Sequence, residues 1–185
     1  MRLLLASKSA TRQRMLVDAG VSFETVGAPF DEAEAKAGLV ASGFEPRDLA
    51  EMLAELKAKS AAAEADDLVL GADQVLELED GTMLSKPTSR DEAAAQLRRM
   101  SGAAHWLHSA AVLVRGGERL WGGSESVTMR VRPLSEDFIA AYLDAEYAAI
   151  RWSVGGYRIE GPGAQLFEAV EGSHFAILGL PLLPL

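Results

Sequence analysis

The segment DLVLGADQVLELEDGTML, residues 67–84, indicates which class of sheet this chain builds. It contains strand-forming runs at 67–72 and 75–78, and then Asp80-Gly81, a dipeptide that favours a tight turn between apolar runs. A hairpin pairs strands antiparallel, whereas strict alternation of strands and helices produces a parallel sheet. The segment therefore predicts a β-ribbon within a mixed sheet.

Upstream of this segment, the pattern predicts a strand and two helices. Residues 2–6 form a short apolar run, and the polar residues after it lead into a helix that ends near Gly20, which suits a left-handed C-terminal cap. From Pro46 towards Ala65, apolar residues recur at helical spacing. The chain is therefore expected to open as strand, polar loop and helix.

Downstream, the pattern predicts two further helices and a long hairpin. Ser89 and Glu92 form a capping box at the start of a helix that Gly102 ends. Residues 106–115 and 120–132 are strand-like and are joined through glycines, and another helix follows them. The whole pattern is typical of an α/β domain with a long twisted mixed sheet.

Composition limits the classes of function. The 185 residues contain no Pro/Ser-rich linker and no repeat, so a single domain over residues 1–185 is expected. The chain has neither a signal-peptide core nor a run approaching about 20 apolar residues, so we expect a cytoplasmic protein that does not bind a membrane. The absence of cysteine excludes disulfides, thiolate metal sites and cysteine nucleophiles. A net charge of -9 argues against binding to a nucleic-acid polymer.

The loop SKSATR, residues 7–12, is the first candidate for chemistry. It places hydroxyl groups and Arg12 where a strand leads into a helix N-terminus, whose free N–H groups and partial positive charge favour an anion. The alternative is that Ser9 or Thr11 only caps the helix. The chain has neither GxGxxG after the first strand nor GxxxxGK[ST], so a dinucleotide or P-loop site is not supported.

Acidic residues are the second group of candidates. Asp73 follows a predicted buried strand, a position from which a carboxylate can bind a divalent metal or orient water. Asp31 and Glu32, in a predicted polar loop, could supply further carboxylates to the same metal. The alternative for Asp73 is that it is only a turn residue after the strand. The alternative for Asp31 and Glu32 is that they only form part of a solvated surface.

Two lysines and a glycine-rich segment complete the candidates. Lys57, on the predicted amphipathic helix, and Lys86 are candidate cations, although lysines on helices ordinarily face solvent. In residues 155–161, Glu160 could accept hydrogen bonds from a base edge; the alternative is a tight loop with one stacking aromatic, Tyr157. Three histidines have no metal-ligand spacing and are interpreted as structural: His105, His108 and His174.

Taken in order, these segments resemble the Maf family of nucleotide pyrophosphatases, whose larger structural relatives include the inosine-triphosphate pyrophosphatases. The resemblance covers nearly the whole chain and rests on a series of motifs: LLLASKSATRQRML, the Asp-Glu pair, AELKA, LVLGADQV, LSKP followed by EAAAQLRRMSG, and GGYRIEGPGAQLFEAVEGSHFAILGLPL. It implies a long twisted mixed sheet with hairpins, flanked by helices around a central cleft. It also implies hydrolysis of a nucleoside triphosphate to the monophosphate and pyrophosphate, with Mg²⁺ or Mn²⁺.

The resemblance further implies roles for individual residues. Asp73 would be the catalytic acid/base or the metal-holding carboxylate, with Glu32 near the metal. The triphosphate would be contacted by Ser7, Ser9, Arg12, Lys57 and Lys86. Gln74 and Glu160 resemble the branch that cleaves 7-methyl-GTP, where the branch that cleaves dTTP and UTP has Thr and Gln. Thr11, a further candidate for substrate binding, fits neither branch, so the base is left open.

Alternatives remain at this point. One is an enzyme of the dTTP/UTP type, and another is a regulator that binds nucleotides without hydrolysing them. A third is a septum-associated interaction protein, which would need a large exposed apolar patch. A homodimer is suggested by the family likeness alone.

Overall fold

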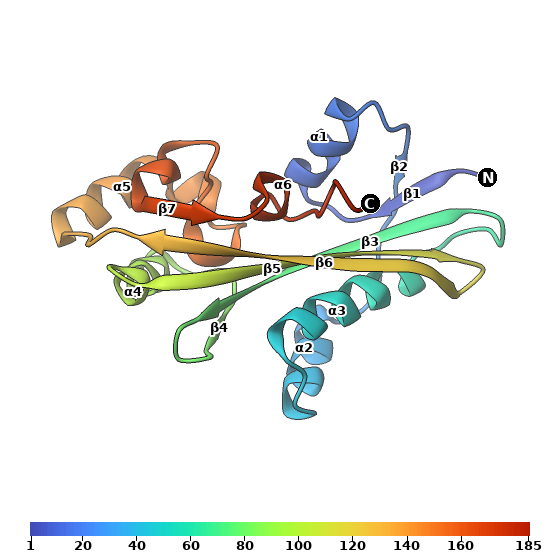
Figure 1. Ribbon diagram of the computed structural model, residues 1–185, viewed down its shortest axis with the longest axis horizontal. Helices are drawn as coiled ribbons and strands as arrows, with labels where there is room; N and C mark the ends of the chain where they lie inside the picture. The colour runs from blue at the N-terminus through green and yellow to red at the C-terminus, as the bar shows by residue number, and fades with distance from the viewer. The chain divides into compact units, whose positions relative to one another are not determined.

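Seven strands pair into one mixed sheet in the computed structural model, which describes residues 1–185 (Figure 1). The strands are β1 (Leu3–Ala6), β2 (Glu24–Thr25), β3 (Leu68–Leu78), β4 (Met83–Leu84), β5 (Ala104–Arg115), β6 (Glu118–Val131) and β7 (Phe167–Glu171). Their order is β2-β1-β3-β5-β6-β7, with β4 paired to β3. β1 is parallel to β2 and β3, whereas β4 is antiparallel to β3 and β7 to β6. The predicted mixed sheet is confirmed.

Helices flank this sheet, as predicted. They are α1 (Ala10–Asp18), α2 (Glu32–Ala41), α3 (Pro46–Ser60), α4 (Arg90–Met100), α5 (Glu136–Ile150) and α6 (His174–Ile177), with two 3-10 helices, η1 (Val154–Gly156) and η2 (Pro162–Leu166). No helix has both the length and the apolar character that crossing a membrane requires. The prediction of a polar loop at residues 31 and 32 was wrong, because α2 begins there.

The chain divides into two compact units. Unit 1 contains residues 1–74, 108–126 and 173–185, and unit 2 contains residues 75–107 and 127–172. Three strands, β3, β5 and β6, contribute residues to both units. The prediction of a single domain stays a prediction.

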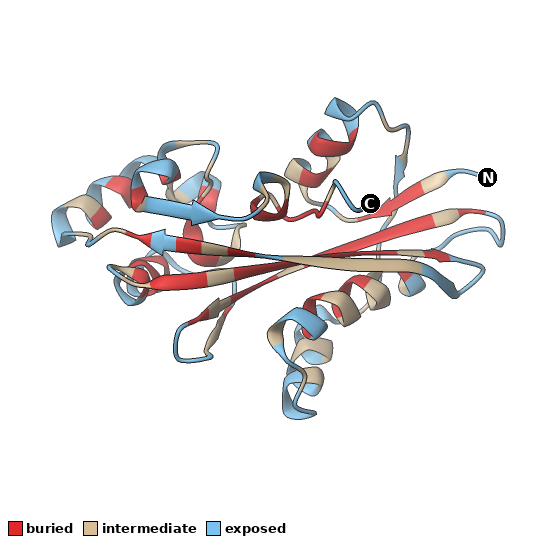
Figure 2. Cartoon of the chain, in the orientation of Figure 1, coloured by how far each residue is buried: buried red, intermediate tan, exposed pale blue.

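In unit 1, the pleat of β3 separates two sets of side chains. β3 is buried along most of its length, as Figure 2 shows. Leu70 and Ala72 belong to a buried cluster with Leu16 of α1, whereas Gly71, between them, faces α3. Residues at odd positions of this stretch therefore face α3, and residues at even positions face α1.

Gly71 allows α3 to approach β3 at backbone distance. A Cβ atom placed on Gly71 would lie 2.0 Å from the carbonyl oxygen of Ala54 and 2.8 Å from the amide nitrogen of Ala58, closer than real Cβ contacts. Both neighbouring atoms belong to the backbone of α3, so neither can rotate away. The missing side chain therefore sets the distance between the helix and the strand.

In unit 2, α4 packs against α5, and a buried polar pair joins β5 to the residue that follows η1. Arg90 of α4 pairs with Asp144 of α5 at 2.5 Å. The hydroxyl of Tyr157 lies 2.7 Å from Nε2 of His105, and both side chains are buried. Burial lowers the pKa of His105 to about 4, so its ring is neutral at neutral pH. The ring of Tyr157 is buried in unit 2 and packs edge-on against Phe167, with 4.9 Å between the ring centroids.

Gly71→Ala tests the close approach of α3 to β3. The added methyl group must displace backbone atoms, so we expect a loss of about 3 kcal/mol in the free energy of unfolding, at the upper end for overpacking. Urea denaturation measures this loss. Gly38→Ala in α2 is the matched control: apart from its chain neighbours and the backbone of its own helix, no heavy atom lies within 4 Å of its Cβ position. It should leave stability unchanged or raise it by up to about 1 kcal/mol. Equal effects of the two substitutions would contradict the role of Gly71.

Candidate functional site

Asp73 is the buried carboxylate from which the candidate site is built. It lies two residues after Gly71 on β3, so the pleat directs it to the face that α3 covers. Its side chain is 9% exposed, and Oδ1 accepts a hydrogen bond from Nζ of Lys57 on α3 at 2.7 Å. The close packing at Gly71 therefore brings an acid of the strand and a base of the helix into contact.

Glu32 supplies a second carboxylate to the same ammonium group. Its Oε2 lies 2.9 Å from Nζ of Lys57, and its side chain is half exposed. Asp31 caps α2, because its Oδ1 accepts a hydrogen bond from the amide of Glu34 at 3.0 Å. This cap sets the start of the helix and places Glu32 in its first turn. Glu32, Lys57 and Asp73 together are called the charge cluster below.

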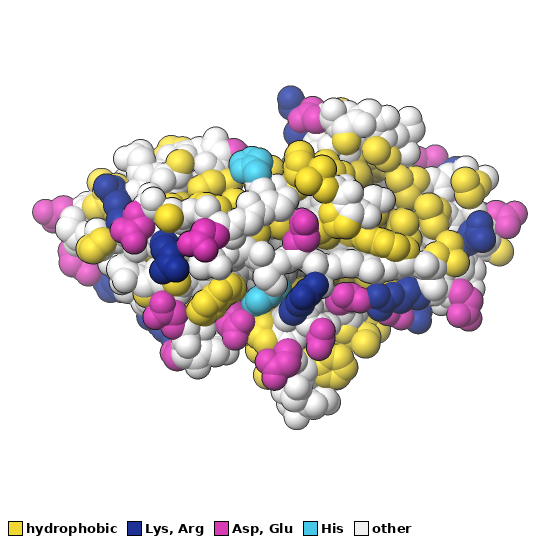
Figure 3. Space-filling model, viewed as in Figure 1, with side chains coloured by type: hydrophobic (Ala, Val, Ile, Leu, Met, Phe, Trp, Pro, Cys, Tyr) yellow, Lys and Arg dark blue, Asp and Glu magenta, His cyan; other side chains and the backbone are white.

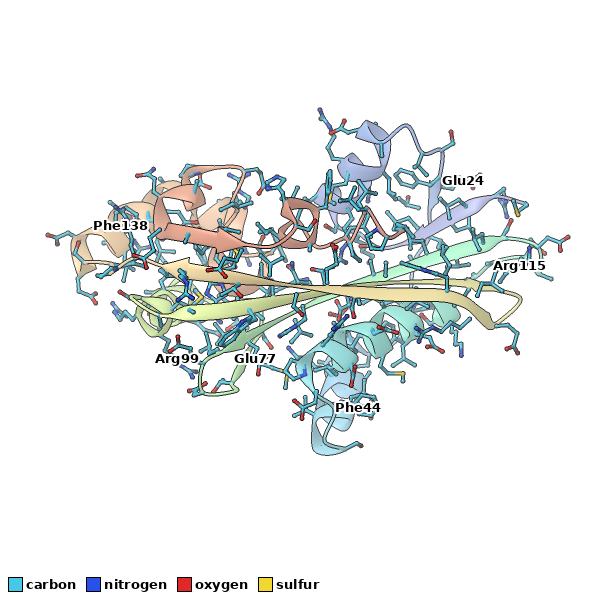
Figure 4. All side chains as sticks on the ribbon, in the orientation of Figure 1. Glu24, Phe44, Glu77, Arg99, Arg115 and Phe138 are labelled. Carbon is cyan, nitrogen blue, oxygen red and sulfur yellow. The ribbon has the colours of Figure 1, made fainter.

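The ion pairs on α3 distinguish Lys57 from its neighbour Lys59. Lys59 pairs with Glu55 on the same helix, at 2.6 Å, and is 43% exposed, whereas Lys57 is 12% exposed. Glu55 also pairs with Arg119 of β6, and Figure 3 shows acidic and basic side chains next to one another in this region. The loop between α2 and α3 carries Phe44, which Figure 4 places beside these helices. Lys57 is therefore the lysine of α3 that serves the charge cluster.

Arg12 is a buried cation in the same unit. Its Nε donates to the carbonyl oxygen of Gly179 at 2.7 Å, and its Nη1 donates to the carbonyl oxygen of Ala72 at 2.8 Å and to Oγ of Ser7 at 3.3 Å. Burial lowers the pKa of Arg12, while attraction to the two acids of the charge cluster opposes this shift. An arginine remains protonated under such conditions, so its positive charge acts on the cluster.

The serines of the first loop hold the N-terminus of α1. Ser9 is the N-cap, and its Oγ accepts from the amide of Arg12 at 3.3 Å, while Oγ of Ser7 accepts from the amide of Ser9 at 3.3 Å. The capping alternative is therefore observed for Ser9. Each hydroxyl still has a proton to donate, so capping and anion binding are compatible. Thr11 is half-buried in the first turn of α1, and its contact with substrate stays a prediction.

Gln74 belongs to the opposite face of β3 from Asp73, because adjacent residues of a strand point to opposite sides. Its Nε2 donates to the carbonyl oxygens of Ala176 and Ile177 at 3.0 Å each and lies 2.9 Å from Oγ of Ser109. Its observed contacts therefore anchor α6 within unit 1. The predicted contact of Gln74 with a base stays a prediction.

Lys86 and Glu160 both lie in unit 2 and are exposed. The backbone before Lys86 is held by Gln96, whose Nε2 donates to the carbonyl oxygen of Ser85 at 2.9 Å. Glu160 lies in the turn before η2, and Arg158 beside it pairs with Glu146 of α5 at 2.7 Å. The roles of Lys86 and Glu160 stay predictions from the sequence.

Sequence reasoning missed Lys36, a cation of α2 in the same electrostatic environment. Asp73 and Glu32 both attract its ammonium group, as they attract Arg12. The signal was present: Asp31 is followed three residues later by Glu34, the spacing of a helix N-cap and an acid in the first turn. A helix from residue 32 places Lys36 one turn after Glu32, on the same face.

Comparisons with known proteins add independent information. A family model described as Maf-like protein matches residues 2–185. A protein named nucleoside triphosphate pyrophosphatase from Sphingopyxis alaskensis is 48% identical, and the alignment covers 100% of this chain and 94% of that relative. One of the same name from Caulobacter vibrioides is 46% identical, covering 98% and 90%. A protein named 7-methyl-GTP pyrophosphatase from Rhizobium meliloti is 47% identical, covering 99% and 92%.

Lys57→Met tests whether the charge cluster stabilises unit 1. The substitution leaves Glu32 and Asp73 close together without their shared ammonium, and removing one partner of a buried pair costs about 3 kcal/mol or more in the free energy of unfolding. Urea denaturation at neutral pH measures this. Lys59→Met is the control on the same helix and should cost less than about 1 kcal/mol, because its pair is more exposed. Equal losses in the two variants would show that the cluster adds nothing specific.

Proposed function

Since this chain belongs to the family of Maf-like proteins, we propose that it hydrolyses a nucleoside triphosphate to the nucleoside monophosphate and pyrophosphate. Relatives at 46–48% identity that carry the names of such enzymes support this assignment over nearly the full chain. The observation that carries the proposal is the ammonium of Lys57, held between the carboxylates of Asp73 and Glu32. In this arrangement Asp73 can act as the acid/base group, and the ammonium of Lys57 can lie beside the phosphate chain.

A divalent cation fits the two carboxylates of the charge cluster. Oxygens of Asp73 and Glu32 lie 2.7 and 2.9 Å from one nitrogen, so both converge on a single positive centre. Carboxylate oxygens suit Mg²⁺ and Mn²⁺. The structure has no group of three or more His, Cys, Asp or Glu side chains that could hold a metal, but Mg²⁺ is commonly bound by one or two carboxylates together with substrate phosphates. When bound there, the ion would neutralise charge on the triphosphate.

The residues of unit 1 would bind and polarise the phosphate chain. The hydroxyls of Ser7 and Ser9 and the N-terminus of α1 provide donors for phosphate oxygens. Lys57 and Arg12 would stabilise the negative charge that develops on the phosphoryl oxygens and on the departing pyrophosphate. Asp73 would accept a proton from the attacking water or hold the ion. Phosphoryl transfer depends mainly on such positioning and charge stabilisation.

Asp73→Asn tests the proposed reaction. The amide keeps the size of the side chain but removes its negative charge, so we expect pyrophosphate release to fall by about a hundredfold or more. The assay uses purified protein, Mn²⁺ and GTP or 7-methyl-GTP, and a chelator should abolish the activity of the wild-type protein. Thermal unfolding confirms that the variant is folded.

Two outcomes would contradict the proposal. A folded Asp73→Asn variant with wild-type turnover would remove Asp73 from the mechanism. A wild-type protein that binds the triphosphate but releases no pyrophosphate would instead be the non-hydrolysing regulator.

We further propose that 7-methyl-GTP is a substrate and that Glu160 reads its base. Two similar proteins are named 7-methyl-GTP pyrophosphatase, at 47% and 43% identity, and Glu160 resembles that branch of the family. A carboxylate accepts hydrogen bonds from the donor groups of a guanine edge, whereas thymine and uracil present a different pattern of donors and acceptors.

Glu160→Gln should change the ranking of substrates. We expect kcat/KM for 7-methyl-GTP to fall by about tenfold relative to dTTP and UTP, because one charged acceptor is lost. Parallel assays with GTP, 7-methyl-GTP, dTTP and UTP measure the ranking. Glu168→Gln, at another exposed acid of unit 2, is the control and should leave the ranking as in the wild-type protein. An unchanged ranking in Glu160→Gln would show that this residue does not read the base.

A further inference from the structure

We propose that Lys36 of α2 binds the phosphate chain of the substrate, as a cation that acts beside Lys57 and Arg12. This inference rests on the proposed function, because it assigns a further binding residue to the same reaction. It is carried by the placement of Lys36 on α2 and by the balance of charge among the groups that interact with Asp73 and Glu32.

The placement of Lys36 on α2 is the first observation. α2 has no buried residue, and its apolar residues Ala37 and Val40 are exposed, yet the charged Lys36 is half-buried. Ala35 and Leu39 are also half-buried, so these three residues mark the inner face of a helix that packs against α3. A lysine ordinarily keeps its charged end in water. Lys36 is therefore turned towards the protein, whereas Ala37 and Val40 are turned towards solvent.

The groups that act on Lys36 are those of the charge cluster. Burial lowers the pKa of Lys36, and attraction to Asp73 on β3 and then to Glu32 on α2 opposes that shift. Arg12 on α1 experiences the same two attractions, and Lys57 on α3 pairs with both acids directly. Charged side chains of α1, α2, α3 and β3 therefore interact with one another in unit 1.

The charges of this region do not cancel. Arg12, Lys36 and Lys57 carry three positive charges, and Glu32 and Asp73 carry two negative charges, so the formal sum is +1. Without Lys36 the sum is zero. Asp31 and Glu34, beside Glu32 at the start of α2, add two negative charges but are exposed, so solvent screens them more strongly than the groups that interact directly. A partly desolvated group of side chains with excess positive charge attracts anions. Lys36 therefore supplies the positive charge that remains once Arg12 and Lys57 have balanced the two carboxylates.

The three cations differ in the group that carries the charge, and each of them interacts with other residues of the protein. Lys57 is shared between two carboxylates, and Arg12 donates to two backbone carbonyls and a hydroxyl. An ammonium on a flexible stem can adjust its position to phosphate oxygens, because it is a compact charge with three donors. The structural alternative is that Lys36 only forms an ion pair with Glu32, one helical turn away. Such a pair contributes little to the free energy of unfolding.

Lys36→Met and Lys36→Arg separate these two roles. Kinetics with the triphosphate and Mg²⁺ give kcat and KM, and calorimetric titration with inorganic pyrophosphate, with and without Mg²⁺, gives affinity independently of turnover. We expect Lys36→Met to raise KM and weaken pyrophosphate binding by about tenfold or more, as for a lost hydrogen bond between charged groups. Lys36→Arg should remain within about threefold of the wild-type protein because the charge is kept. Lys59→Met, whose lysine pairs with Glu55, should match the wild-type protein.

The outcomes distinguish this inference from the proposed function. If the wild-type protein releases pyrophosphate and folded Lys36→Met keeps the wild-type KM and pyrophosphate affinity, Lys36 does not bind phosphate and the proposed function stands. A lower thermal stability of Lys36→Met with unchanged affinities has the same meaning and assigns Lys36 to the pairing role. If the wild-type protein neither hydrolyses a triphosphate nor binds pyrophosphate, the proposed function fails and this inference fails with it.

Discussion

The contact between the ammonium of Lys57 and the carboxylate of Asp73 is the interaction on which the candidate site depends. The ammonium nitrogen and the carboxylate oxygen are 2.7 Å apart, and the contact joins α3 to β3. It forms because Gly71, two residues before Asp73, lets the backbone of β3 approach the backbone of α3. Ion pairs of this kind are costly to bury and require accurate geometry. The close packing of α3 on β3 therefore positions the ion pair of the candidate site. Substitutions that move the helix away from the strand would also separate Lys57 from Asp73.

Much of the fold could be predicted, because hydrophobic period and turn residues act locally. The hairpin at Asp80-Gly81, the helix capped by Ser89 and the mixed sheet follow from signals within a few residues. The helix α2 was missed because it buries none of its residues and so has no apolar period to detect. Its only strong local sign was the cap at Asp31, which was interpreted as part of a polar loop.

The candidate site was predictable in part, and its limits have a physical cause. The types of residue that bind phosphate and metal indicated Asp73, Lys57, Glu32 and Arg12, which the structure places in one unit. The two carbonyl partners of Gln74, at Ala176 and Ile177, lie 102 and 103 positions further along the chain, and no local pattern encodes such a contact. The buried position of Lys36 depends on how α2 packs against α3, which is a tertiary property.

The residues that hold the C-terminal segment of unit 1 recognise its main chain. Arg12 and Gln74 donate to carbonyl oxygens of Ala176, Ile177 and Gly179, and every amino acid has such an oxygen. Exchanges of side chains along this segment would leave these bonds intact, provided the local path of the chain is kept. Selection on residue identity in this segment therefore comes from packing, as at the fully buried Ala176 and Leu180, and from the left-handed backbone of Gly179, whose φ is +96°, and not from these hydrogen bonds.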